Sequence, residues 1–104
     1  RDSIGIELIK KFLKRKVKVT VHDPRAMENT ENVFKNKINY AKSVKDAISG
    51  SQCVIIMTQW KQYEKLSNKD FKQMKNKFVI DCRRMLIRKK LDVDYFGIGI
   101  GNEI

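Results

Sequence analysis

The sequence has few of the residues on which catalytic and metal sites depend: one histidine, two cysteines and five glycines among 104 residues. His22 stands alone at the end of a β-branched run, without the cluster of histidine, cysteine or carboxylate ligands that a metal site needs. The glycines form neither a Gly-x-Gly-x-x-Gly turn before a helix nor a P-loop, because Gly97, Gly99 and Gly101 are spaced by two. We therefore expect no catalytic residue and no metal ligand in this chain.

Long apolar runs are also absent. No stretch approaches the roughly 18 apolar residues that a membrane-spanning helix requires, and the first residues do not have the pattern of a signal peptide. Cys53 and Cys82 each lie in or at the end of a short apolar stretch, so we expect both to be buried free thiols, as is typical of the reducing cytosol. These features predict a cytoplasmic protein that does not enter a membrane.

Acidic residues are scarce as well, which leaves a formal net charge of +11. The lysines and arginines are spread over the whole sequence, so a solvated basic surface is one interpretation. A nucleic-acid-binding module is another, although the sequence lacks a recognition-helix pattern and a row of stacking aromatic residues, and we expect no nucleic acid partner. A third interpretation is an oligomerisation domain without a ligand of its own.

Helical and extended patterns alternate along the chain. Apolar residues at helical spacing predict an amphipathic helix to about Lys16, with Ser3 as its N-cap. Ser43 and Asn68 predict two further N-caps, and Gly50 is a natural helix stop. The expected helices are 4–16, 26–37, 43–49, 60–66 and 68–74, and the expected strands are 17–21, 38–41, 52–58, 77–81 and 95–100.

Two of the expected strands contain short, continuous apolar runs, at residues 53–57 and 78–80. Such runs are typical of strands buried on both faces of a parallel sheet, and strands that alternate with helices predict right-handed crossovers. We therefore expect one domain over residues 1–104, with a Rossmann-like, three-layer α/β fold and a mostly parallel sheet. Such a sheet normally begins with a strand, whereas this sequence begins with a helix. We therefore expect the first strand to lie upstream of residue 1; the alternative is that something else completes the sheet.

Polar residues follow both apolar runs, where open α/β sheets place their ligand sites. Arg83 lies just beyond the second run and is the best candidate for a binding residue, because its planar guanidinium suits phosphate or ribose oxygens. A surface ion pair with Asp81 is the alternative for this side chain. Asp81 itself is expected to orient the turn rather than to transfer a proton.

Five short segments stand out in order along the chain: Arg1-Asp-Ser3, Val19-Thr-Val-His-Asp-Pro24, Met57-Thr-Gln-Trp60, Asp81-Cys-Arg-Arg84 and Tyr95-Phe-Gly-Ile-Gly99. Taken together, they resemble the carboxyl-terminal, UDP-binding domain of the UDP-glucose/GDP-mannose dehydrogenase family. The family patterns are Arg-x-Ser, a strand ending in Tyr-Asp-Pro, Thr-Glu-Trp, Asp-Gly-Arg and Tyr-x-Gly-Ile-Gly. Each pattern alone is weak, but five in this order and spacing cover nearly the whole chain.

The resemblance implies that the chain is the nucleotide-sugar-binding domain of a larger, NAD-dependent nucleotide-sugar 6-dehydrogenase, which oxidises the C6 alcohol of a UDP-sugar to a carboxylate. It implies that Arg83 contacts the nucleotide part of the substrate and that Arg1 reaches the NAD cofactor, which the amino-terminal domain binds for the most part. The catalytic cysteine also belongs to that domain, so this chain alone is expected to be inactive. The implied partners are the UDP-sugar, the amino-terminal NAD-binding domain and further copies in a homo-oligomer.

The sequence departs from the family patterns at three positions. Gln59 replaces the glutamate of Thr-Glu-Trp, Cys82 replaces the glycine of Asp-Gly-Arg, and His22 replaces the tyrosine of Tyr-Asp-Pro. The family's Phe-Lys strand, whose lysine belongs to the substrate site, would precede Arg1. UDP-glucose, UDP-N-acetylmannosamine and GDP-mannose enzymes share these motifs, so the identity of the sugar stays open.

Overall fold

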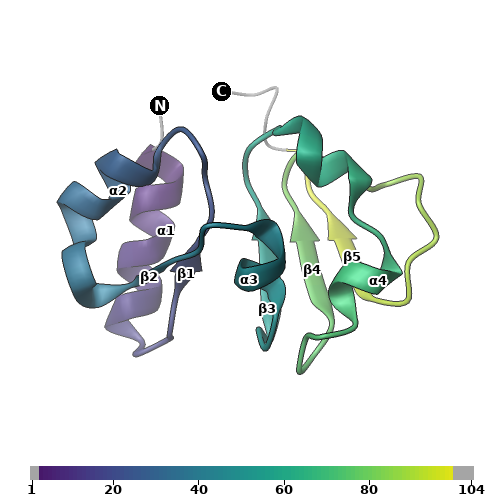
Figure 1. The fold of residues 1–104 in the computed structure, drawn as a ribbon, viewed down its shortest axis with the longest axis horizontal. Coiled ribbons are helices and arrows are strands. Elements are labelled where there is room, and N and C mark those ends of the chain that lie inside the picture. Colours follow the sequence, from purple (N-terminus) through teal and green to yellow (C-terminus); the bar gives the residue numbers. More distant parts are fainter. Residues whose placement is uncertain (1–2, 100–104) are drawn as a thin grey trace. The chain divides into compact units, whose positions relative to one another are not determined.

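Helices alternate with parallel strands over residues 3–99, which are the residues that the computed structural model describes (Figure 1). Contacts within the chain divide it into two compact units, residues 1–47 and residues 48–104. Each unit has its own sheet, and the described strand pairs of both sheets are parallel. The predicted α/β class with a parallel sheet is therefore confirmed, whereas the single domain over residues 1–104 stays a prediction.

The first unit pairs β1 with β2 in a two-stranded sheet. Phe34, Ile38 and Ala41 supply its buried apolar side chains. The apolar face of α1 is half-buried, and Ile4 at its start is exposed. The elements of this unit are α1 (Ser3–Lys14), β1 (Thr20–Val21), α2 (Met27–Phe34), the 3₁₀ helix η1 (Lys35–Lys37), β2 (Asn39–Tyr40) and most of α3 (Val44–Ile48).

The strand expected over residues 17–21 is shorter in the structure, and the end of α1 includes the first of these residues, Val17. Lys16 has a left-handed φ of 62°. Its N–H donates to the carbonyl of Leu13 at 3.0 Å, and the next N–H along the chain donates to the carbonyl of Phe12 at 2.9 Å. This is the Schellman pattern of a helix end, with a lysine where glycine is usual. The strand β1 begins only after this turn.

The second unit is built on a sheet with the strand order β3-β4-β5, and its three strands run side by side in Figure 1. Successive side chains of a strand point to opposite faces, and here one face is much more exposed: Phe78 is 41% exposed and Val79 is 0% exposed. The prediction that both faces are buried is therefore wrong for this sheet.

The two cysteines of this unit differ in exposure. Cys53 pairs with Phe78 on the more exposed face and is itself exposed, whereas Cys82 is buried as predicted. The elements are β3 (Cys53–Ile56), the 3₁₀ helix η2 (Lys61–Lys65), α4 (Asn68–Phe71), β4 (Phe78–Asp81) and β5 (Asp94–Gly97).

Side-chain caps and a glycine set the ends of the short helices. Ser43 caps α3 by accepting a backbone N–H at 3.1 Å, and Gly50 follows the helix with a φ of 77°, as predicted. The cap of α4 is Ser67 and not Asn68, which corrects the prediction. Ser67 and Asp70 form a capping box, in which the Ser67 N–H donates to Asp70 Oδ2 at 2.8 Å. The Ser-x-x-Asp spacing was therefore the better signal for the start of this helix.

The capping box makes a testable contribution to stability. Ser67→Ala is expected to lower the free energy of unfolding by about 1 kcal/mol, because the backbone amide of Asp70 loses its side-chain acceptor. Denaturant titration of the two proteins measures this difference. Lys69→Ala, an exposed position in the same helix, is the control and is expected to change stability by less than about 0.5 kcal/mol. An equal loss for both variants would contradict the capping role.

Candidate functional site

The carboxyl ends of β3 and β4 lie side by side. The two strands pair in parallel up to Ile56 and Asp81, and the N–H of Cys82 extends the pairing by donating to the carbonyl of Ile56 at 2.9 Å. The loops that follow the two strands therefore leave the same edge of the sheet. The adjacency expected from the two apolar runs is confirmed.

Asp81 organises the turn after β4. It is 0% exposed, and its carboxylate accepts three hydrogen bonds. Oδ1 accepts the N–H of Arg83 at 3.2 Å, and Oδ2 accepts the N–H of Leu86 at 2.8 Å and the hydroxyl of Tyr95 at 2.8 Å. Two of the three donors are backbone groups of the turn, so Asp81 orients this turn, as predicted.

Two titratable neighbours of Asp81 are held in their neutral forms. Burial, followed by the hydrogen bond to Asp81, raises the pKa of Tyr95, so its hydroxyl remains a donor at neutral pH. Burial also raises the pKa of the Cys82 thiol, and the charge of Asp81 adds to this effect. A protonated thiol is a weak nucleophile. These groups therefore hold the turn together rather than provide a reactive centre.

Arg83 is half-buried, and its guanidinium spans the two strand ends. Its Nη2 donates to Gln59 Oε1 at 2.9 Å, while its Nε is shielded from solvent and has no hydrogen-bond partner among the described residues. Within residues 3–99 its side chain forms no ion pair with Asp81, because only the backbone N–H of Arg83 reaches that carboxylate. The ion-pair alternative is therefore wrong, and the guanidinium keeps an unused donor.

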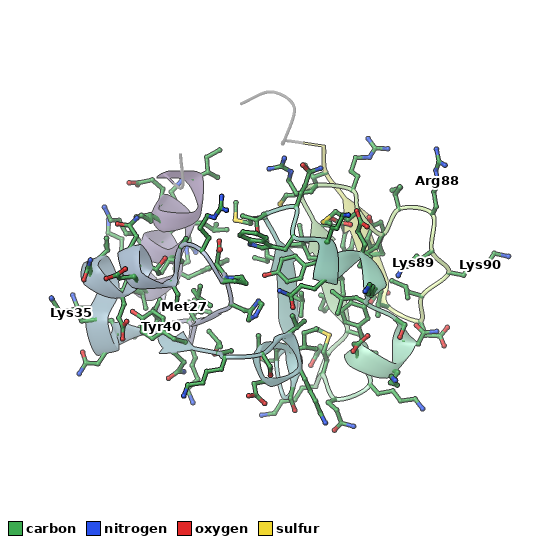
Figure 2. The ribbon with its side chains drawn as sticks, turned by 45° about the horizontal axis from the view of Figure 1, so that its top comes forward. Met27, Lys35, Tyr40, Arg88, Lys89 and Lys90 are labelled. Carbon is green, nitrogen blue, oxygen red and sulfur yellow. The ribbon has the colours of Figure 1, made fainter. Side chains whose placement is uncertain are left out.

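An open pocket of about 580 Å³ lies at these loops, with Gln59 and Arg83 in its lining. Small-molecule sites commonly have volumes in this range. The loop from β4 to β5 contributes Arg88, which points outward in Figure 2, while Lys89 beside it donates to the carbonyl of Leu66 at 2.8 Å. Four cations against one carboxylate make the lining favourable for an anion. The charged lining residues are Lys61, Arg83, Arg84, Arg88 and Glu64.

Gly97, the last residue of β5, and Gly99, just beyond it, lie under side chains of the turn that follows β4. A Cβ at Gly99 would lie 3.1 Å from Cδ of Arg84, and a Cβ at Gly97 would lie 2.8 Å from Cδ1 of Ile87. Arg84 itself has a left-handed φ of 54°. Glycine at position 99 therefore leaves room for the arginine side chain to cross directly over the backbone.

Sequence patterns predicted only part of this site. Arg83 lies in the pocket, and its role in binding stays a prediction. The role of Gln59 was not predicted, because the sequence shows it only as a departure from Thr-Glu-Trp. Its place just after the first apolar run is the signal that puts it at the same edge of the sheet. Arg1, the residue expected to reach NAD, lies outside the described residues. Among residues 3–99 no group of three or more His, Cys, Asp or Glu side chains could hold a metal ion.

Within residues 3–99, no helix has the length and apolar character needed to cross a bilayer.

Comparison with known proteins gives a consistent family assignment. The family described as "UDP-glucose/GDP-mannose dehydrogenase family, UDP binding domain" matches residues 1–88. Two similar relatives are UDP-glucose 6-dehydrogenases: the one from Haloferax volcanii is 34% identical over 95 residues, and the one from Rickettsia bellii is 32% identical over 88 residues. These matches cover 91% and 83% of this chain, but 21% and 20% of the relatives.

A solved structure shows the same likeness. The structure of a UDP-glucose dehydrogenase from the hyperthermophilic archaeon Pyrobaculum islandicum matches with a TM-score of 0.75 and 32% identity, and covers 93% of this chain and 21% of that chain. This likeness confirms the Rossmann-like fold. The chain thus spans about a fifth of the length of these relatives.

Proposed function

This chain is a member of the UDP-glucose/GDP-mannose dehydrogenase family, and from that premise we propose that it is the UDP-sugar-binding part of an NAD-dependent nucleotide-sugar 6-dehydrogenase. The reaction oxidises the C6 alcohol of the sugar to a carboxylate. The task of this chain is to hold the nucleotide so that the sugar is presented to the catalytic residues of the amino-terminal domain.

The observation that carries the proposal is the state of Arg83. Its guanidinium lies at the carboxyl ends of two parallel strands and is held by Gln59 through Nη2 alone. A buried, unpaired Nε costs on the order of 1–3 kcal/mol, and a small turn of the side chain toward an anion would remove that cost. Because Gln59 is neutral, it orients the guanidinium without cancelling its charge, and such a fork suits the oxygens of a diphosphate or a ribose.

Binding at this pocket would serve the reaction by positioning. A nucleotide held at one end fixes the sugar attached to it, and a fixed substrate reacts as in an intramolecular step. The other cations of the pocket, Lys61, Arg84 and Arg88, raise the local positive potential and favour the capture of an anionic substrate. NAD, when bound, would accept the hydride. Arg1, which the resemblance places near NAD, lies outside the described residues.

In the proposed enzyme, the first strand of the sheet and the NAD-binding domain lie in polypeptide that precedes this chain. A doubly wound sheet has the strand order 3-2-1-4-5-6, and without strand 1 that order leaves strands 3-2 and strands 4-5-6 as separate sheets. The described strands pair in this way, as β2-β1 and β3-β4-β5. This pattern, together with the fifth of the relatives' length that the chain spans, supports a preceding strand and an amino-terminal NAD-binding domain. We extend the proposal to a homo-oligomer in the cytoplasm, where two free cysteines are expected to persist.

Titration calorimetry of the full-length protein with UDP tests this function. We expect one UDP to bind per chain, and duplex DNA at the same phosphate concentration to leave the UDP affinity unchanged. If the net charge of +11 served nucleic acid instead, DNA would bind with a steep salt dependence and displace UDP. A full-length protein that binds no UDP would reject the nucleotide-sugar function.

A further inference from the structure

Arg84 has a backbone conformation that arginine rarely adopts. Lys16, Lys35 and Arg84 are the described non-glycine residues with positive φ. Lys16 lies in the Schellman end of α1, where a left-handed residue is common. Lys35 follows α2 with a φ of 50° and a ψ of −127°, which lies outside the left-handed helical region. Arg84 instead lies in the turn that lines the pocket, with a φ of 54°. Left-handed backbone at a residue other than glycine costs of order 1–3 kcal/mol and is found preferentially at functional sites.

The turn explains the conformation of residue 84, but it does not explain why an arginine is there. The N–H of Arg84 donates to the carbonyl of Asp81 at 3.3 Å, and the Asp81 carboxylate holds the N–H groups on either side, at Arg83 and Leu86. These backbone bonds would be available to glycine at position 84 with less strain. The backbone bonds of the turn therefore do not account for the guanidinium of Arg84.

Gly99 leaves open the path that the Arg84 side chain takes. Cδ of Arg84 lies 3.1 Å and Nη1 lies 3.6 Å from the point where a Cβ of residue 99 would stand. The side chain thus lies along the backbone after β5 and remains part of the pocket lining. Arg88, by contrast, projects outward from its loop in Figure 2.

We propose that Arg84 is a second anion-binding residue of this pocket, that Arg83 and Arg84 together take two neighbouring phosphate groups of one ligand, and that Gly99 sets the direction of the Arg84 guanidinium. The proposal rests on the proposed function, because it divides the diphosphate of the nucleotide-sugar between two adjacent arginines. Each guanidinium offers several N–H groups in a plane, so each of the two arginines can bind one phosphate group. Arg84 thereby gives the site its preference for a diphosphate over a monophosphate.

The direct test compares the affinities of the full-length protein and its variants for UDP and UMP by titration calorimetry. Arg84→Gly is expected to weaken UDP binding by about tenfold or more, to change UMP binding far less, and to raise the melting temperature because the strained φ is relieved. Lys90→Ala removes one exposed charge from the same loop outside the pocket lining and is expected to leave both affinities unchanged (Figure 2). Equal UDP affinity in Arg84→Gly and wild type, equal weakening of UDP and UMP, or equal weakening by Lys90→Ala would each overturn the proposal.

Gly99→Ala tests the direction of the side chain without changing any charge. The added methyl group pushes Arg84 aside, so we expect weaker UDP binding in the wild-type background and no further effect in the Arg84→Gly background. This double-mutant cycle isolates the contact between the two residues. If Gly99→Ala weakens binding equally in both backgrounds, Gly99 acts independently of Arg84 and its assigned role is wrong.

Inorganic pyrophosphate separates the failure of this proposal from the failure of the proposed function. If the wild-type protein binds pyrophosphate but no UDP, and Arg84→Gly weakens pyrophosphate binding, the nucleotide function fails and the role of Arg84 stands. If UDP binds and Arg84→Gly leaves its affinity unchanged, the function stands and the role of Arg84 fails. If neither ligand binds, the pocket is not an anion site and both are rejected.

Discussion

Arg83→Ala in the full-length enzyme is expected to raise the KM for the nucleotide-sugar at least about tenfold, which corresponds to about 1.4 kcal/mol of lost binding. The reason is geometric: the Arg83 guanidinium lies at the carboxyl ends of β3 and β4, with Nη2 held by Gln59 and Nε unused. The kcat is expected to change less, because the proposed function places the reacting groups in an amino-terminal domain outside this chain. Steady-state kinetics with varied nucleotide-sugar measures both values, and an unchanged KM would remove Arg83 from the site.

Two companion variants separate charge from orientation at this position. Arg83→Lys keeps the positive charge but loses the planar fork, so we expect a KM between those of wild type and Arg83→Ala. Gln59→Ala keeps the arginine but removes its 2.9 Å partner, so we expect a smaller rise in KM from a less well oriented guanidinium. If Arg83→Lys matched the wild type, charge alone would account for binding and the fork would be irrelevant.

The order of helices and strands was predictable because it depends on local patterns. Apolar spacing located α1, continuous apolar runs located β3 and β4, and Ser43 with Gly50 bounded α3. The misses came from contacts that local composition does not encode. Lys16 takes a left-handed conformation usually left to glycine and so shortens β1, and Cys53 is exposed because only one face of the second sheet is buried.

The site was predictable to the extent that it follows from parallel strand ends. Arg83 could be singled out because it comes directly after a buried strand. Its bond to Gln59 spans 24 positions of the sequence, and the approach of Arg84 to Gly99 joins two loops, so neither has a local signature. The doubled arginine of the Asp-Cys-Arg-Arg motif and the repeated glycines after β5 were the available signals, and only the folded backbone shows that they meet.

Asp81→Ala is expected to lower the free energy of unfolding by about 3–5 kcal/mol, the largest such loss in the second unit, residues 48–104. Asp81 is 0% exposed, and its removal leaves the backbone N–H groups of Arg83 and Leu86 and the Tyr95 hydroxyl without their acceptor. A buried donor left unpaired costs about 1–3 kcal/mol. The Leu86 bond is buried and the other two are part-buried, so the total falls in the lower half of the range for three donors. Denaturant titration measures the free energy of unfolding, and a loss below about 1 kcal/mol would show that solvent or a local shift replaces the carboxylate.

Tyr95→Phe and Asp81→Asn divide this loss between the turn and β5. Tyr95→Phe removes one donor and leaves both backbone bonds, so we expect a cost of about 1 kcal/mol. Asp81→Asn keeps the volume and one acceptor oxygen, so its loss of stability should fall between those of Tyr95→Phe and Asp81→Ala.

The hydrogen bond from Tyr95 also predicts a pH dependence. Since the pKa of Tyr95 is raised above its ordinary value of 10.0, the stabilising effect of its hydroxyl should be complete below pH 10.0 and decline as the pH rises further. The stability difference between wild type and Tyr95→Phe should therefore be constant near neutral pH and shrink in strong alkali, and a difference that grows with pH would contradict the hydrogen bond from Tyr95 to Asp81.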